Sequence, residues 1–186
     1  MSSLATPAQL GAFLQTTIAD NDATALLMLD IASGMVRDYL QLTLDPVSNE
    51  VVLLDPIEGS FVMLPELPIT SVSKVEIFDG TTWTELTTDK YTVSKRLGII
   101  SGLPGVGVDF PTKPESWRVT YSHGYSAMPS TIVGVTLALS ARMYTAPDGI
   151  NSESIGGYSV SYATAGEGFT KLEMTALARY KNPRIA

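Results

Sequence analysis

The hydrophobic pattern of the chain changes its period twice, and this constrains the fold more than any other feature. In residues 6–44, and again in 129–146 and 170–182, apolar residues recur at three- and four-residue spacing, the period of a helix that faces a core. From about 50 to 125 the chain instead carries seven short runs rich in β-branched or aromatic residues between turn residues, which is typical of antiparallel strands. The sequence therefore predicts an α+β fold: a small helical bundle with two N-terminal helices, one central and one C-terminal, and an inserted antiparallel β block.

The first helical stretch is expected to contain two helices. Thr6-Pro7 supplies a capping hydroxyl and a proline at the first helical position of a short helix. After the polar break at 20–22, whose acids are expected to act as caps, a second helix runs to about Leu40. Its apolar stripe repeats every four residues and comprises Leu27, Ile31, Met35 and Tyr39. Further apolar residues flank the stripe, so we expect a wide face that is largely buried.

Local signals also mark the later elements. Asp79-Gly80 separates two strand-like runs and predicts a hairpin, because glycine accepts the positive φ of tight turns. Pro129 predicts the start of the central helix. Thr170 and Glu173 have the spacing of a capping box, which predicts the start of the last helix.

Between the last two helices the sequence predicts a strand in which apolar or aromatic residues alternate strictly with serines. Residues 158–162 read Tyr-Ser-Val-Ser-Tyr, which places Tyr158, Val160 and Tyr162 on one face and the two serines on the other. The apolar face needs a partner, and two remain open. The core of the same subunit is slightly favoured, while pairing with a neighbour gives the hypothesis of a subunit–subunit contact.

Composition restricts the class of protein. A chain of 186 residues, with 45% hydrophobic and 17% charged residues, is long enough for a single domain spanning 1–186. The chain has no cysteine, which excludes disulfides and thiolate metal sites and fits synthesis in a reducing cytoplasm. No stretch has the pattern of a secretion signal or the length of a membrane span. We therefore expect a protein made in the cytoplasm, with no membrane partner.

The net charge of −7 is unevenly distributed. Residues 1–89 contain 13 acidic and 2 basic residues, whereas 90–186 contain 6 acidic and 10 basic residues. Because nucleic-acid affinity comes largely from basic residues that neutralise phosphates, no sequence-specific nucleic-acid binding is expected. The asymmetry has two interpretations, ordinary surface solvation and complementary faces on neighbouring subunits, of which the first is favoured.

The sequence contains no set of residues that indicates catalysis, a metal or a cofactor. His123 is the single histidine, and no spacing places it beside a nucleophile and an orienting acid. One histidine without cysteine is a poor metal-ligand set. The glycine-rich stretch 102–107 lacks the Lys and Ser/Thr of a nucleotide loop and predicts a surface turn. We expect no enzyme activity and no cofactor.

The order of the elements, together with a series of short motifs, resembles the head-to-tail connector (adaptor) family of tailed phages, especially the adaptors of actinobacteriophages. The resemblance spans nearly the whole chain. The motifs, in chain order, are MVRDYL at 35–40, LP at 64–65, PITSV at 68–72, VTYSHGY at 119–125, MP at 128–129, IGGYSVSY at 155–162 and ARYKNPRI at 178–185.

This resemblance implies a structural protein of the virion neck with neither catalysis nor cofactor. Such an adaptor forms a homo-oligomeric ring, dodecameric in the virion, which is added below the portal protein after DNA packaging. The ring extends the DNA channel, so that DNA passes through its lumen, and it binds the next neck or tail protein.

For the portal contact we single out the basic and aromatic C-terminal residues Arg179, Tyr180, Lys181 and Arg184. Arginine and tyrosine are enriched at binding hot spots, which favours this hypothesis. An equally weighted alternative is that Leu172, Ala176 and Tyr180 pack the last helix onto the core while the basic residues complement its dipole.

Two other function classes stay open. A stopper or tail-completion protein would share the virion setting but tend toward a β-barrel, which the helical residues 6–40 disfavour. A monomeric ligand-binding β-domain would use the aromatic residues of the β block as a stacking platform. These residues are Trp83, Tyr91, Trp117 and Tyr121. Packing in the core and on the sheet is the favoured role for them.

Overall fold

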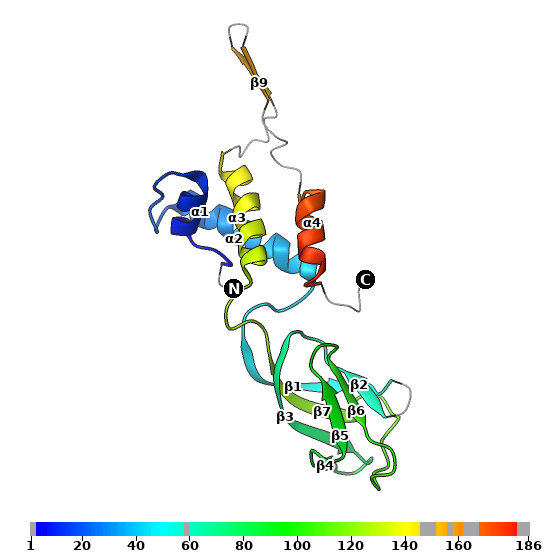
Figure 1. The fold of residues 1–186 in the computed structure, drawn as a ribbon. Helices are drawn as coiled ribbons and strands as arrows, with labels where there is room; N and C mark the ends of the chain where they lie inside the picture. Colours follow the sequence, from blue (N-terminus) through cyan, green and yellow to red (C-terminus); the bar gives the residue numbers. More distant parts are fainter. Residues whose placement is uncertain (1–2, 58–59, 146–151, 156–157, 162–167, 182–186) are drawn as a thin grey trace. The chain divides into compact units, whose positions relative to one another are not determined.

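The two periods of the sequence correspond to two compact units in the computed structural model (Figure 1). The structure describes residues 3–57, 60–145, 152–155, 158–161 and 168–181. One unit, called the helical unit, comprises Met1–Gln41 and Ala127–Lys181. The other, called the β-unit, comprises Leu42–Ser126 and is inserted between the two segments of the first. The α+β fold with an inserted antiparallel block is therefore confirmed, and the single domain spanning 1–186 stays a prediction.

The described residues of the helical unit form four helices, at the predicted places. They are α1 (Pro7–Leu14), α2 (Ala23–Leu40), α3 (Ser130–Thr145) and α4 (Lys171–Ala178). The predicted caps are present as hydrogen bonds from Gln9 N to Thr6 Oγ1 at 3.2 Å, from Ala25 N to Asp22 Oδ1 at 2.8 Å and from Glu173 N to Thr170 Oγ1 at 3.2 Å. Each satisfies an N–H group that the first helical turn leaves unpaired. None of the described helices combines the length and the apolar content needed to cross a bilayer.

Helices α1, α2 and α3 enclose the core of the helical unit. Its buried members are Ala5, Leu10, Ile18, Ala25, Leu29, Leu137 and Ala141. The alanines leave room for the helices to approach closely. Ser33 is buried beside this core, where its hydroxyl donates to Leu29 O at 2.6 Å and accepts from Leu4 N at 2.9 Å. The segment that precedes α1 is thereby attached to α2.

The prediction that the wide apolar face of α2 is largely buried was wrong for its N-terminal half. The buried residues of this helix are Ala25, Leu29, Ala32, Ser33, Val36 and Leu40. Leu27 and Ile31 lie on the opposite side and are 54% and 42% exposed. Only one of the two apolar sides of α2 can face α1 and α3, and the side with small residues does so because it permits close packing.

The β-unit consists of two antiparallel sheets (Figure 1). The four-stranded sheet has the order β1–β7–β3–β4, with bounds Val47–Leu54, Trp117–His123, Ile69–Phe78 and Trp83–Glu85. The three-stranded sheet has the order β2–β6–β5, with bounds Phe61–Met63, Ile99–Gly102 and Tyr91–Ser94. All seven strands expected between about 50 and 125 are present. The stretch 102–107 forms the predicted turn after β6.

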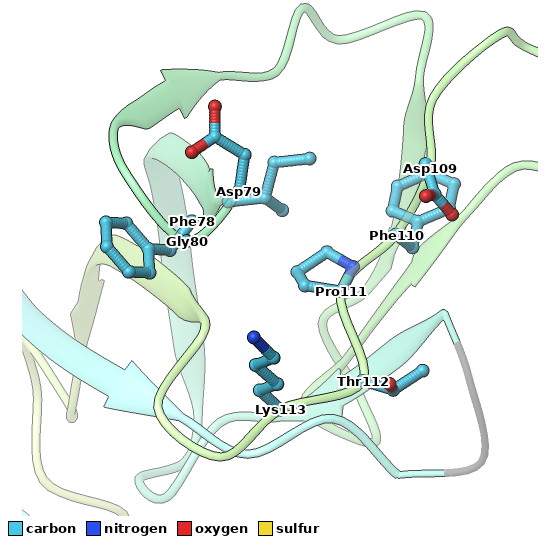
Figure 2. Close-up of a pocket in the computed structure, with 9 residues that line it drawn as sticks. Phe78, Asp79, Gly80, Asp109, Phe110, Pro111, Thr112 and Lys113 are labelled. Carbon is cyan, nitrogen blue, oxygen red and sulfur yellow. The ribbon is translucent and has the colours of Figure 1, made fainter.

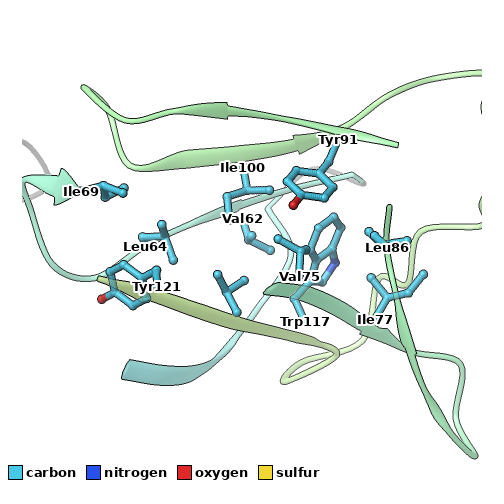
Figure 3. Packing of buried hydrophobic residues seen from close by; sticks show 11 residues of the cluster. Val62, Leu64, Ile69, Val75, Ile77, Leu86, Tyr91, Ile100, Trp117 and Tyr121 are labelled. Carbon is cyan, nitrogen blue, oxygen red and sulfur yellow. The ribbon is translucent and has the colours of Figure 1, made fainter. Parts of the chain in front are cut away.

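Side chains from both sheets meet in one core (Figure 3). Strand β7 contributes every second residue to it, and Trp117, Val119 and Tyr121 are fully buried. The Phe110 ring stacks on Trp117, with a centroid distance of 5.6 Å and an interplanar angle of 12°. The favoured core role of the aromatic residues is confirmed for Trp117, Tyr121 and Tyr91.

The predicted hairpin joins β3 to β4. Gly80 has a φ of +103°, and Asp79 Oδ1 accepts from the backbone N–H groups of Thr82 at 2.8 Å and Thr81 at 2.7 Å. These hydrogen bonds, that of Thr82 first, lower the pKa of Asp79. The side chain of Asp79, the first residue of the turn, therefore stabilises the turn.

The polypeptide enters and leaves the β-unit at neighbouring points. Tyr125 N donates to Leu44 O at 2.9 Å, and Gly124 N donates to Pro68 O at 3.0 Å. Gly124 has a φ of +88°, and a Cβ atom there would collide with the backbone of Asp45. Only glycine fits this close crossing of the two segments.

Candidate binding surfaces

A charged clamp attaches α4 to α3. The Arg142 guanidinium on α3 donates to both carboxylate oxygens of Glu173, at 2.7 and 3.0 Å. Glu173 Oε2 also accepts from Thr170 N at 2.8 Å, so one carboxylate caps α4 and binds the arginine. Burial opposes ionisation of Glu173, but the hydrogen bonds from Arg142 and Thr170 outweigh it and hold the pKa of Glu173 below its usual range. The capping role was predicted, whereas no local signal indicated the partner on α3.

The structure describes three of the four residues hypothesised to contact the portal. Arg179 is exposed, and its guanidinium carbon lies 5.2 Å from the centroid of the Tyr180 ring. Lys181 Nζ lies 5.3 Å from the centroid of the Tyr39 ring on α2, a cation–π contact within the helical unit. Arg184 lies outside the described residues. Lys181 thus contacts the helical unit, while Arg179 stays accessible to a partner. The alternative that packs Leu172 onto the core was wrong for this residue, which is 80% exposed.

The residues of the predicted alternating strand fall in a two-stranded hairpin. Strand β9 (Tyr158–Ser161) pairs with β8 (Ser152–Ile155), so that Tyr158 lies opposite Ile155 and Val160 opposite Glu153. Tyr162 lies outside the described residues. Strand β8 was not predicted, because Ser-Glu-Ser-Ile has only one residue that favours a strand. The hypothesis of a subunit contact at Tyr158, Val160 and Tyr162 stays a prediction.

The outer face of the four-stranded sheet carries a charged cluster. Arg118 donates to both oxygens of Glu76, at 2.8 and 2.6 Å, and Lys74 Nζ lies 3.0 Å from Glu76 Oε1. The Arg118 guanidinium carbon lies 4.4 Å from the centroid of the Trp83 ring. These neighbours cover Glu76, which is only 5% exposed. The hydrogen bond from Arg118 lowers the pKa of Glu76 to about 2.

We expect the β-unit to lose stability as the pH falls from about 4.5 towards about 2. The pKa of Glu76 falls from 4.5 to about 2 on folding, so the unfolded chain takes up the proton first. The stabilisation by ionised Glu76 is therefore complete above pH 4.5 and is lost as the pH falls through that window. Thermal unfolding followed by circular dichroism measures the decline. A Glu76→Gln variant should be less stable at neutral pH, and its stability should fall less steeply as the pH is lowered. If the stabilities of the two proteins fell in parallel with pH, Glu76 would not be the group responsible.

A cavity of about 330 Å³ lies between the β3–β4 hairpin and the loop that precedes β7 (Figure 2). Its polar lining comes mainly from Asp79, Asp109 and Lys113, which Figure 2 shows at separate positions around the space. The Asp79 carboxylate is already bound by its own turn. Among the described residues, no three His, Cys, Asp or Glu side chains gather as a metal site would require. We assign no chemistry to this cavity.

His123 forms a structural pair with Glu50. The His123 ring is buried at the end of β7, and its Nε2 lies 2.9 Å from Glu50 Oε2. Ser122 points to the other face of the strand, where its hydroxyl accepts from Asn49 N at 3.1 Å. The structure therefore does not bring Ser122 and His123 together as a nucleophile and base.

Comparison with known proteins gives matches of fold. No protein-family model matches the chain, and no curated protein matches its sequence. A chain in the neck of a native gene transfer agent particle, computed with C12 symmetry, is 17% identical with a TM-score of 0.56 and covers 96% of this chain and 89% of its own. A chain in the neck of an empty particle, computed with C6 symmetry, is 16% identical with a TM-score of 0.55 and covers 95% and 90%.

A chain in the virion of a native gene transfer agent particle is similar to the same extent. It is 17% identical with a TM-score of 0.57, and the match covers 100% of this chain and 96% of that one. Because the match covers 100% of this chain, it includes both the helical unit and the β-unit. The protein therefore shares its complete fold, from first helix to last, with chains of gene transfer agent particles.

Proposed function

We propose that the protein is a structural, non-enzymatic component of the neck of a phage-like particle, where it acts as a head-to-tail adaptor. The observation that carries the proposal is the similarity of the fold, over 95% or more of the chain, to chains in the necks and virion of gene transfer agent particles. A helical bundle alone or a β-sandwich alone occurs in many unrelated proteins. Their combination in one chain, with the β-unit inserted after α2, is more specific.

In this role the chain forms a homo-oligomeric ring, dodecameric in the virion, that joins the portal protein to the next neck or tail protein. DNA passes through the lumen of the ring. The C12 and C6 symmetry of the similar neck structures supports a cyclic assembly. A ring repeats one heterologous contact, so each subunit presents two different complementary faces. The hairpin residues Tyr158, Val160 and Tyr162 remain the hypothesis for one such contact.

The location of the chain in particles tests the proposed function. Particles released from producing cells are labelled with an antibody against the chain and viewed by electron microscopy. We expect label at the junction of head and tail. Particles from cells that lack the gene serve as the control for antibody specificity. Label confined to the tail shaft, or found only on unassembled protein, would refute a neck role.

We expect added salt to weaken the ring. The acidic residues of 1–89 and the basic residues of 90–186 offer complementary charge on neighbouring subunits. Exposed charge pairs are screened over about 8 Å at physiological ionic strength and over about 3 Å at 1 M. Light scattering across a salt series measures the mass of the assembly. A mass that does not change with salt would show that charge does not hold the subunits together.

For the portal contact we propose Arg179, Tyr180, Lys181 and Arg184. We expect removal of residues 181–186, or the substitution Arg179→Ala, to reduce binding to portal-bearing capsids in a sedimentation assay, because exposed arginines anchor many interfaces. Lys171→Ala is the matched control, since Lys171 is an exposed basic residue at the other end of α4. Normal binding by the truncated chain would defeat the proposal.

The two alternative functions have less support. A monomeric ligand-binding β-domain would need an aromatic platform on its surface, yet Trp117 and Tyr121 are fully buried and Tyr91 is 9% exposed. A stopper or tail-completion protein built as a β-barrel would lack the helical unit.

A further inference from the structure

Among the residues that the structure describes, those that cover the apolar stripe on the outer side of α2 lie over its C-terminal half. There the segment that contains α4 lies against it: the Phe169 ring is 5.3 Å from the Tyr39 ring, and a Cβ atom on Gly168 would lie 3.9 Å from Met35 Cε. Leu27 and Ile31 continue the same stripe towards the N-terminus of α2, and both are exposed. Four-residue spacing places them on one side of the helix, so they form an unpartnered extension of a contact already made within the chain.

Helix α4 carries an exposed apolar residue of its own. Glu173 and Leu177 are the buried residues of this helix. Leu172 is 80% exposed, the largest value among the exposed large hydrophobic residues of the described chain. Arg179 follows Leu172 by seven residues, two helical turns, and therefore lies on the same side of α4. This side of α4 therefore presents the apolar side chain of Leu172 and the positive charge of Arg179.

The two surfaces carry opposite charge. Asp30 and Asp38, both exposed, border the side of α2 that presents Leu27 and Ile31. Arg179 borders Leu172 on α4. An apolar centre flanked by complementary charges is the usual anatomy of a specific interface, because the charges orient the partners while the apolar residues supply affinity.

We propose that the Leu27–Ile31 side of α2 in one copy binds the Leu172–Arg179 side of α4 in the next copy. The occupant is a second copy of this chain, because the proposed ring needs two different complementary faces and these two surfaces match in chemistry. Asp30 of one copy pairs with Arg179 of its neighbour at the edge of the contact. The proposal rests on the proposed function and names a contact that repeats around the ring, beside the one hypothesised for the hairpin. In this contact Arg179 binds the neighbouring copy, which leaves Tyr180, Lys181 and Arg184 for the portal.

Two single substitutions disable the two sides separately. Leu27→Asp and Leu172→Asp each leave one intact side, and both residues are exposed, so each variant should unfold at the temperature of the unaltered chain. We expect each to lower the association constant more than about 10-fold in analytical ultracentrifugation, as the loss of an interface anchor does. Leu53→Asp is the matched control, since Leu53 is 51% exposed against 54% for Leu27 but lies in the β-unit.

A mixture of the two variants tests the pairing itself. The intact α4 of the Leu27→Asp chain can bind the intact α2 of the Leu172→Asp chain, so the mixture should form dimers that neither variant forms alone. If two α2 helices bound each other instead, the Leu172→Asp chain would associate by itself, and mixing it with the Leu27→Asp chain would add no further dimers. Because the chain has no cysteine, Asp30→Cys and Arg179→Cys chains can be joined by a short bifunctional thiol reagent, which should link only the mixed pair.

The outcomes separate this contact from the proposed function. Two results would overturn the contact. One is a Leu27→Asp chain that assembles as well as the unaltered chain. The other is an unaltered chain that stays monomeric up to about 1 mM, because a Kd of about 1 mM corresponds to a binding free energy of only about −4 kcal/mol. Either result leaves the neck role standing if the antibody labels the head–tail junction. Absence of the chain from particles overturns the neck role, whatever the variants do.

Discussion

Replacing Trp117 by alanine is expected to lower the free energy of unfolding of the β-unit by about 3–5 kcal/mol. The indole is fully buried at the start of β7 and stacks on Phe110 between the two sheets. Its removal leaves a void that hydrogen-bonded strands cannot collapse to fill, so the transfer free energy and the lost packing contacts are both forfeited. Urea unfolding followed by far-ultraviolet circular dichroism measures the change.

The second tryptophan is the matched control for this substitution. Trp83 lies on the outer face, where it packs on Phe78 and beneath Arg118, so Trp83→Ala should cost about 1 kcal/mol. Trp117→Phe should cost far less than Trp117→Ala. Within the described chain Trp117 Nε1 has no hydrogen-bond partner, so phenylalanine loses no bond there. Equal losses for Trp117→Ala and Trp83→Ala would contradict this account of the core.

The substitution Arg142→Met is expected to release α4 at a cost of about 2–4 kcal/mol. It leaves the Glu173 carboxylate without its cation, and removal of one partner from a buried ion pair costs about 3–5 kcal/mol. The Arg142 and Glu173 side chains are 23% and 11% exposed, so water lowers this value somewhat. Besides this clamp, α4 itself buries only Leu177. The loss should therefore appear locally, before the helical unit unfolds.

Hydrogen exchange resolves that local change. The amides of α4 should lose protection in Arg142→Met, while those of the buried side of α2 keep theirs. The double variant Arg142→Met with Glu173→Gln is the control, because glutamine can still cap Thr170 but leaves no uncompensated charge. It should recover part of the lost protection. If both variants exchange alike, the unpaired charge is not what releases the helix.

The parts of the fold that were predicted correctly depend on signals within a few residues. The caps at Thr6, Asp22 and Thr170 and the turn at Asp79-Gly80 each involve a side chain and backbone groups two or three residues away. Hydrophobic periodicity predicted the helices and seven strands for the same reason. Such features are determined by neighbours in the sequence and survive in any packing.

The parts that were missed depend on partners far along the chain. Glu76 and Arg118 are 42 residues apart, and Arg142 and Glu173 are 31 apart, so no spacing rule connects them. The prediction that the wide apolar face of α2 is largely buried was wrong for its N-terminal half, because periodicity shows two apolar sides without showing which one the other helices cover. The portal and subunit residues stay predictions because their partners are other molecules.

The close crossing at Gly124 has a consequence for how such chains diversify. Because Tyr125 N and Leu44 O are hydrogen-bonded, the β-unit begins and ends at neighbouring points. The helical segments before and after it therefore need not be separated to accommodate it. A module joined in this way can lengthen, shrink or be exchanged between genes as one cassette, as domains with adjacent termini generally can. The β-unit can then change in length or sequence while the described helices keep the packing of their own core.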